Sequence, residues 1–168
     1  KKYDVIVVGG GAAGMMAAIS AAKEGAQVAL IEKNEKLGKK IYITGKGRCN
    51  LTNATDFDGF MQNVVTNKKF LYAALKSFDS AKCMDFFENL GLPLKIERGN
   101  RVFPASDKSS DVIKALSEGA KRAGVKIKLN EKVTALTVEN GIVTEIKTDK
   151  GSYFPDKAVI CTGGISYP

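Results

Sequence analysis

Residues 3–14, YDVIVVGGGAAG, decide the fold of this chain. The run from Tyr3 to Val8 is rich in β-branched residues and ends at three consecutive glycines, which is typical of a buried parallel strand closed by a turn. Ala12–Lys23 is rich in Ala and Met, and a glycine soon follows it, so it predicts a helix with a C-terminal stop. Gln27–Ile31 is a second short apolar strand, with Glu32 at its carboxyl end. This order of elements predicts a complete βαβ unit.

Gly9, Gly11 and Gly14 form the pattern G-x-G-x-x-G directly after the first strand and at the start of the helix. In this context Gly9 permits the tight turn, Gly11 lets the backbone approach a pyrophosphate, and Gly14 lets the helix pack closely on the strand. The helix N-terminus, at Ala12 and Ala13, offers free N–H groups and the positive end of the helix dipole to phosphates. The sequence therefore predicts a dinucleotide site.

Glu32 follows the glycine motif at about the distance expected of a ribose-binding acid. A carboxylate there accepts hydrogen bonds from ribose hydroxyls and disfavours a 2′-phosphate, so NADP is not expected in this particular site. The same fingerprint serves NAD and FAD, and the motif alone does not choose between them.

A long, basic, glycine-rich loop over residues 33–53 follows the acid, where a simple NAD-binding domain usually continues into another crossover helix. Long ordered loops of this kind tend to be functional. Arg48, with backbone N–H groups of Gly45 and Gly47, is expected to close over a pyrophosphate from the side opposite the helix. The densest group of lysines lies in the same loop: Lys33, Lys36, Lys39 and Lys40. These cations suit a small anion, and the alternative interpretation is an ordinary surface loop.

Composition excludes several classes of protein. The chain is 44% hydrophobic and 26% charged, which excludes disordered and collagen-like chains. It has no His, which excludes His-containing catalytic triads and His-based metal sites within this sequence. The net charge of +8 comes from scattered lysines, so a solvated surface is favoured over a nucleic-acid-binding one. The uncharged stretch Val5–Ala22 is interrupted by glycines, and we expect neither a transmembrane helix nor a signal peptide.

Cys49, Cys83 and Cys161 are an odd number of widely spaced cysteines without a C-x-x-C pair. This pattern indicates reduced thiols in a cytoplasmic protein rather than a disulfide framework. It also argues against a dithiol redox mechanism, which requires two neighbouring thiols.

Residues 56–90 predict helices, because apolar residues recur there at helical spacing, and we expect the aromatic residues among them to belong to the core. The apolar residues at this spacing are Phe70, Leu71, Ala74, Leu75 and Phe78. Ser80 is the expected cap of a second helix. Leu94–Phe103 predicts a hairpin, and Ser110 is expected to cap a helix over residues 111–123.

Val125–Leu129 predicts a third parallel strand. Asn140-Gly141 is a strong two-residue turn signal and predicts a hairpin over residues 132–148. Ser152–Pro155 is expected to add a third strand to this hairpin, and Val159-Ile160 to return separately to the main sheet. The predicted fold class is α/β, with a parallel sheet, helices and a β-meander.

Thr44–Asn53 reads TGKGRCNLTN and resembles the G-x-G-R-C-N-x-T-N signature of the HI0933-like or BaiN-like bacterial flavoproteins, also described as aminoacetone-oxidase-like FAD-binding enzymes. Gly99–Val112 and Ala158–Pro168 agree with the same family, so the likeness covers nearly the whole chain. Lys46 replaces a glycine found in many relatives. The resemblance implies a Rossmann-like FAD-binding domain of the glutathione-reductase type over residues 1–168. Family members continue into an inserted substrate domain and a C-terminal return to the FAD domain, so we expect this chain to be an N-terminal part.

The resemblance also implies further contacts with FAD. In the glutathione-reductase-like architecture the backbone near Val133 would meet the adenine, and Thr162 and Gly163 would approach the cofactor across the strand ends. The segments that resemble the family add three more expected contacts: Cys49, Asn50 and Gly164.

The implied function is flavin-dependent oxidoreduction. Hydride would pass from NADH or NADPH through FAD to a small organic acceptor, such as an unsaturated or carbonyl compound, with oxidase chemistry toward dioxygen as a sister possibility. No catalytic residue is assigned and no metal is expected. The expected partner is a small-molecule substrate, with neither nucleic acid nor a membrane, and the oligomeric state is open. Two alternatives remain: a non-catalytic dinucleotide-binding module, and a basic nucleic-acid-binding domain.

Overall fold

The computed structural model describes residues 1–164. The chain divides into two compact units, the first made of residues 1–40 and 116–168 and the second of residues 41–115. The end of the T-G-G-x-S-Y-P segment, Ile165–Pro168, lies outside the described residues.

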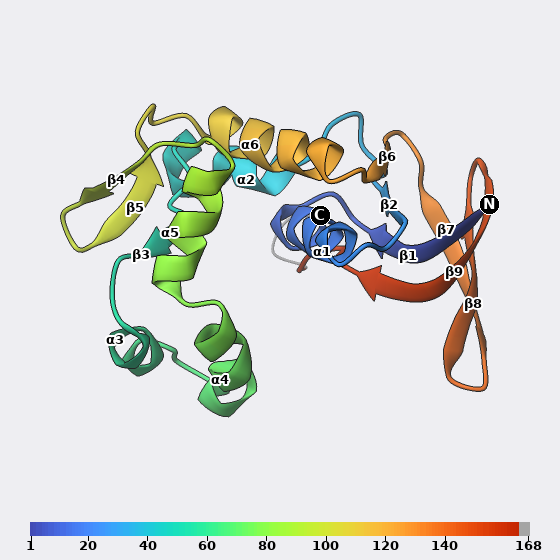
Figure 1. Ribbon diagram of the computed structural model, residues 1–168, viewed down its shortest axis with the longest axis horizontal. Coiled ribbons are helices and arrows are strands. Elements are labelled where there is room, and N and C mark those ends of the chain that lie inside the picture. Colours follow the sequence, from blue (N-terminus) through green and yellow to red (C-terminus); the bar gives the residue numbers. More distant parts are fainter. Residues whose placement is uncertain (165–168) are drawn as a thin grey trace. The chain divides into compact units, whose positions relative to one another are not determined.

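The first unit is built on a six-stranded sheet of order β6-β2-β1-β9-β8-β7 (Figure 1). Four of its strands run parallel: β1 (Lys2–Val8), β2 (Val28–Ile31), β6 (Lys126–Lys128) and β9 (Gly151–Ile160). Helix α1 (Ala12–Lys23) connects β1 to β2 and packs against both strands. The predicted βαβ unit and the third parallel strand are therefore confirmed.

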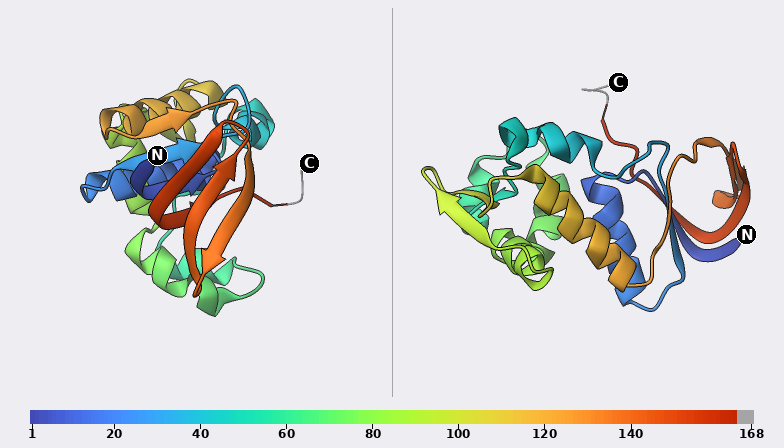
Figure 2. Two further views of the ribbon diagram at one scale, coloured as in Figure 1. Left: turned by 90° about the vertical axis from the view of Figure 1, so that its right-hand side faces the viewer. Right: turned by 90° about the horizontal axis from the view of Figure 1, so that it is seen from above.

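β7 (Val133–Glu139) and β8 (Ile142–Thr148) form the predicted antiparallel hairpin, which Figure 2 shows beside β9. Its turn residues, Asn140 and Gly141, both have positive φ, as a tight hairpin requires. The expectation of two separate strands after the hairpin is wrong. β9 is one strand that pairs antiparallel with β8 at its start and parallel with β1 from Phe154 onward.

The core of the first unit lies where β1, β2, β8 and β9 meet. Its largest members are fully buried, and burial of such a side chain stabilises the fold by about 1.5–3 kcal/mol. They include Ile6, Ile31, Ile146 and Tyr153. The Tyr153 hydroxyl donates a hydrogen bond of 2.7 Å to Oε1 of Glu131, so its polar atom is paired inside the core.

Three helices occupy the region predicted as helical: α3 (Phe57–Gln62), α4 (Lys68–Ser77) and α5 (Ser80–Asn89). Ser80, the predicted N-terminal cap of α5, is wrong by one residue. Asp79 caps α5, because its carboxylate accepts a hydrogen bond of 2.9 Å from the Lys82 N–H, whereas the Ser80 hydroxyl contacts Thr52 instead.

The aromatic residues of α4 do not belong to a core, contrary to expectation. The residue Phe70 is 85% exposed and Phe78, at the C-cap, is 37% exposed, whereas Leu71 and Leu75 are half-buried. Helical spacing identifies an apolar face, but it does not reveal whether another element covers that face.

The second unit also holds a small sheet of order β3-β5-β4, with β3 (Thr52–Asn53), β4 (Leu94–Glu97) and β5 (Arg101–Pro104). The antiparallel β4–β5 pair confirms the predicted hairpin. The loop predicted after Glu32 contains short helices: α2 (Lys39–Ile43) and the 3₁₀-helix η1 (Thr44–Gly47).

Helix α6 (Ser109–Arg122) confirms the helix predicted over residues 111–123, but it begins two residues earlier and ends one residue earlier. Ser110 is inside the helix and is not its cap. The Ser109 hydroxyl donates to the Tyr42 carbonyl oxygen at 2.9 Å.

In the part of the chain that the structure describes, no helix is long and apolar enough to cross a membrane.

Candidate functional site

The glycine turn between β1 and α1 tolerates no side chain at two positions. Gly9 has a φ of +104°, and a Cβ built on it would lie 2.3 Å from the Cys161 carbonyl oxygen. A Cβ on Gly14 would lie 1.8 Å from the Gly9 carbonyl oxygen, far inside van der Waals contact. The turn, the helix and the segment after β9 therefore meet at backbone distance, as the glycine pattern predicts.

Gly11, in contrast, faces open space. It is the N-cap residue of α1 with an extended backbone, and a Cβ there would meet nothing within 4 Å. The N–H groups of the first helical turn have no acceptor within the helix, and Ala12 and Ala13 are exposed. These donors and the open position of Gly11 form a cradle that fits a pyrophosphate.

Glu32 lies at the carboxyl end of β2, and the residue is only 8% exposed. Its Oε2 accepts a hydrogen bond of 2.7 Å from the Gly10 N–H. Its Oε1 accepts bonds from the Asn34 backbone N–H at 2.9 Å and from the Asn34 Nδ2 at 2.6 Å. The predicted ribose-binding acid is therefore tied directly to the glycine turn.

The other predicted residues of the first unit lie at the same carboxyl edge of the sheet. The Glu131 N–H donates to the Glu32 carbonyl oxygen at 3.0 Å, which places the start of β7, with Val133, next to the acid. The Cys161 N–H donates to the Val8 carbonyl oxygen at 2.7 Å, so the segment after β9 leaves the sheet beside the glycine turn. That segment holds the predicted Thr162, Gly163 and Gly164.

The predicted lysines of the loop take different positions. Lys39 donates through Nζ to Oδ1 of Asn34 at 3.1 Å and pairs with the Glu35 carboxylate at 3.0 Å. Lys33 is exposed. Lys40 donates to the Gly164 carbonyl oxygen at 3.1 Å, which joins the loop to the segment after β9.

The remaining predicted contacts, from Gly45 to Asn50, belong to the second unit. Gly45 and Gly47 have positive φ, and a Cβ on Gly45 would lie 2.8 Å from the Asn50 backbone nitrogen. The Asn50 Nδ2 donates to the Val102 carbonyl oxygen at 3.0 Å. Glycine is therefore required at position 45 by the tight turn itself.

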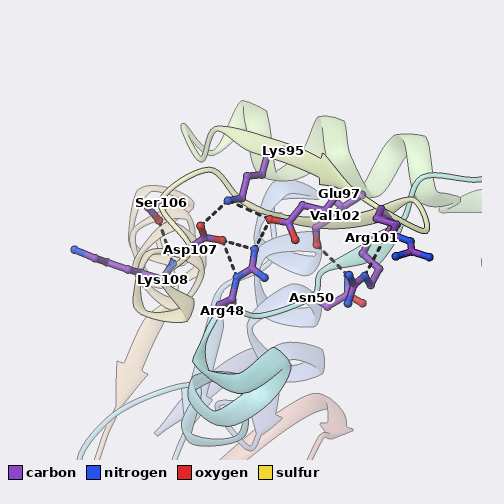
Figure 3. A network of polar contacts seen from close by, with 10 residues as sticks. Arg48, Asn50, Lys95, Glu97, Arg101, Val102, Ser106, Asp107 and Lys108 are labelled. Atoms are coloured by element: carbon purple, nitrogen blue, oxygen red, sulfur yellow. Dashed lines mark hydrogen bonds and ion pairs between the residues drawn. The ribbon is translucent and has the colours of Figure 1, made fainter.

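Arg48 is the centre of a network of four charged side chains (Figure 3). Its guanidinium donates to the Asp107 carboxylate at 2.7 Å, pairs with Glu97, and lies 4.1 Å above the centroid of the Phe103 ring. Lys95 completes the network through both carboxylates, at 2.5 Å from Asp107 and 3.2 Å from Glu97. These contacts fix the loop of Arg48 to the β4–β5 hairpin.

Burial raises the pKa of the Cys49 thiol, and Cys83 is affected in the same way. Both thiols are free. A raised pKa disfavours the thiolate, so the structure gives Cys49 no sign of nucleophilic activation. Among residues 1–164 no cluster of acidic, Cys or His side chains is placed to hold a metal ion.

Residues 3–168 match the family described as the HI0933-like protein Rossmann domain. The chain belongs to this family. One relative is the 3-dehydro-bile acid delta(4,6)-reductase of Clostridium scindens, 39% identical over 163 residues, which are 94% of this chain and 38% of the relative. Another is the ribosomal RNA dihydrouridine synthase of Escherichia coli, 28% identical over 169 residues, which are all of this chain and 41% of the relative. This chain thus spans about two fifths of each of these relatives.

The 3-ketosteroid-delta4-(5alpha)-dehydrogenase of Rhodococcus jostii RHA1 has a similar structure, with a TM-score of 0.74 and 19% identity. The likeness covers 97% of this chain and 46% of that one, and it shows a shared fold. This HI0933-like chain is a FAD-binding Rossmann domain of the kind found in flavin oxidoreductases. The cradle at Gly11, the donors of α1 and the Glu32 carboxylate fit the pyrophosphate and the adenosine ribose of FAD.

Sequence reasoning missed three features of the site: the Gly10 N–H that binds Glu32, the Asn34 amide, and the partners of Arg48. The sequence did contain a signal for the partners of Arg48. Arg48 and Asp107 lie in the two separate segments that resemble the family signature, and such segments often meet in the fold.

Replacing Glu32 with Ala in this HI0933-like domain is expected to weaken FAD binding about ten- to a hundredfold. The substitution removes the predicted acceptor for ribose hydroxyls and leaves the N–H groups of Gly10 and Asn34 without their carboxylate. A fluorescence titration with FAD measures the effect. Unchanged affinity would remove the ribose assignment, and Glu118→Ala, at an exposed acid of α6, controls for the loss of one negative charge.

The Arg48 network is expected to make stability depend on pH. Hydrogen bonds from Arg48 lower the pKa of Glu97, and those from Lys95 lower the pKa of Asp107. A carboxyl group with a lowered pKa in the folded state stabilises the fold above its ordinary pKa, here 4.5 and 3.8, and loses this contribution as the pH falls through the lowered value.

Denaturant unfolding between about pH 6 and pH 3 tests this expectation. The free energy of unfolding of the natural chain is expected to fall more steeply with acidification than that of an Arg48→Met, Lys95→Met double variant. Equal slopes would show that these ion pairs contribute nothing to acid sensitivity.

Proposed function

We propose that this chain is the FAD-binding part of an oxidoreductase that reduces a carbon–carbon double bond conjugated to a carbonyl group in a small molecule, with NADH or NADPH as the electron donor. The observation that carries the proposal is the dinucleotide cradle, in which an open Gly11 and a buried carboxylate stand at one edge of the sheet. Bound FAD supplies the redox chemistry, because its isoalloxazine accepts and donates hydride.

The names of two relatives support the choice of substrate class. One names the reduction of delta(4,6) double bonds in a 3-dehydro bile acid, and the other names the synthesis of dihydrouridine. In both substrates the double bond that becomes saturated is conjugated to a carbonyl group. A double bond of this kind accepts hydride at its β-carbon, because the carbonyl oxygen takes up the developing negative charge.

The residues of this chain have a supporting role in that chemistry. The N-terminus of α1 binds the pyrophosphate, Glu32 binds the adenosine ribose, and the backbone near Val133 borders the adenine. These contacts fix one half of FAD on the sheet and leave the isoalloxazine for the substrate.

We also propose a cytoplasmic location, which the free thiols of Cys49, Cys83 and Cys161 support.

The test is anaerobic reduction of the full-length protein that contains this domain. A purified protein with a visible flavin spectrum is expected to bleach on addition of NADH or NADPH, and a 3-oxo-Δ4 steroid is expected to restore the colour. A colourless protein that gains no flavin from added FAD would overturn the proposal. If dioxygen restores the colour and the steroid does not, the protein acts as an oxidase. If neither NADH nor NADPH reduces the bound FAD, the chain is a non-catalytic binding module.

A second candidate substrate is a uridine in RNA. It is favoured by the name of the Escherichia coli relative and by the net charge of +8. RNA binding that weakens steeply with salt, together with recovery of flavin colour by RNA, would favour it over a small molecule.

A further inference from the structure

We propose that Asn34 restricts Glu32 to a single ribose hydroxyl of the bound dinucleotide, and that Asn34 is thereby a positioning residue that sets ribose specificity. The inference rests on FAD binding at the glycine turn. It concerns how the acid recognises the sugar, because the two vicinal hydroxyls of the adenosine ribose compete for the free acceptor positions of one carboxylate.

The carboxylate of Glu32 is largely occupied by the protein itself. An ionised carboxylate has about four lone-pair positions, two on each oxygen. The Asn34 backbone N–H and side-chain Nδ2 take both positions on Oε1, at 2.9 and 2.6 Å. The Gly10 N–H takes one position on Oε2, at 2.7 Å. One position, on Oε2, is left for a ligand.

The side-chain amide of Asn34 is held in the orientation that this count requires. The ammonium of Lys39 lies 3.1 Å from Oδ1 of Asn34, and an ammonium group only donates hydrogen bonds. Oδ1 must therefore face Lys39, which leaves Nδ2 to face Glu32. The same ammonium also pairs with the Glu35 carboxylate at 3.0 Å.

The backbone on either side of the acid is also fixed. The Glu32 N–H donates to the Lys128 carbonyl oxygen at 2.8 Å, and the Asn130 N–H donates to the Asn34 carbonyl oxygen at 3.0 Å. These bonds tie the segment to the end of β6 on both sides of Lys33. The acid and the amide are therefore positioned relative to each other before a ligand binds.

One ribose hydroxyl is expected to donate to Oε2, and the other receives no acceptor from Glu32. Removal of the Asn34 amide opens a position on Oε1, next to Oε2, where the second hydroxyl can bind. The substitution Asn34→Ala is therefore expected to change the selectivity among ribose analogues, which a merely structural role would leave unchanged.

The experiment uses the flavin-free protein and measures competition with FAD by ADP, 2′-deoxy-ADP and 3′-deoxy-ADP. In the natural protein one of the two deoxy analogues is expected to bind about tenfold or more weakly than ADP, and the other within about twofold of ADP. In Asn34→Ala the two analogues are expected to lose affinity to similar extents. Gln27→Ala, which removes an exposed amide before β2, is the matched control and is expected to keep the natural preference.

Equal losses for the two analogues in the natural protein would overturn the inference, and so would an unchanged preference in Asn34→Ala. The comparison in the natural protein requires no substitution, so it decides the question even where the variant does not fold. If the natural protein binds FAD but the two deoxy analogues lose affinity equally, only the inference about Asn34 is overturned and the proposed function stands. A protein that binds neither FAD nor ADP overturns the proposed function as well.

Discussion

Replacing Gly14 with Ala is expected to abolish FAD binding and to destabilise the first unit by about 3 kcal/mol. The added Cβ would lie 1.8 Å from the backbone carbonyl oxygen of Gly9, and neither backbone segment can move without breaking the contact between α1 and β1. For a chain of this size we expect the melting temperature to fall by about 10 °C. Thermal unfolding followed by circular dichroism, together with a FAD titration, measures both effects.

The neighbouring position Ala18, buried in the same helix, provides a control for the stability measurement. Ala18→Gly removes one methyl group from the helix without a clash and is expected to cost about 1 kcal/mol through helix propensity. A Gly14→Ala protein as stable as the natural chain would contradict the close approach of helix and turn.

Replacing Gly11 with Ala is expected to lower the affinity for FAD about a hundredfold while leaving the fold intact. The backbone of Gly11 has φ −81° and ψ −167°, which alanine adopts without strain, and its Cβ would meet nothing within 4 Å. The new methyl group would instead occupy the space of the pyrophosphate. The melting temperature without FAD is therefore expected to stay within about 2 °C of the natural value.

The combination of the two measurements is what tests the site. Unchanged FAD affinity in Gly11→Ala would show that the pyrophosphate does not approach the turn at this residue. A large loss of stability in flavin-free Gly11→Ala would instead show that the open space next to Gly11 is needed for folding and not for ligand binding.

The sequence was sufficient for the βαβ unit and its glycine turn, because their signals are local. Tyr3–Val8 has the composition of a buried strand, and Gly14 is required by a contact five residues away, with Gly9. The hairpin at Asn140-Gly141 was equally accessible, since both positions require positive φ. The FAD contacts of the predicted site residues stay predictions, although the structure brings Gly9, Gly11 and Glu32 to one edge of the sheet.

The errors have a different physical origin, because they depend on neighbours that are remote in sequence. We predicted two strands between Ser152 and Ile160, yet β8 and β1 on either side pair with this segment as one strand. Phe70 has the spacing of a core residue, but no local pattern reveals that the face is uncovered. The partners of Arg48 lie 49 and 59 positions further along the chain, beyond any local pattern.

The continuous strand β9 also has a consequence for the order of folding. β1 pairs with it from Lys2 opposite Phe154 to Val8 opposite Ile160, so its pairing closes a loop of about 150 residues. Contacts of such long range form slowly, because the entropy of loop closure is lost before the strands gain their hydrogen bonds. During synthesis the glycine turn therefore lacks its contact with the backbone of Cys161 until β9 has emerged from the ribosome. If FAD binds at this turn as predicted, it is expected to join the chain late.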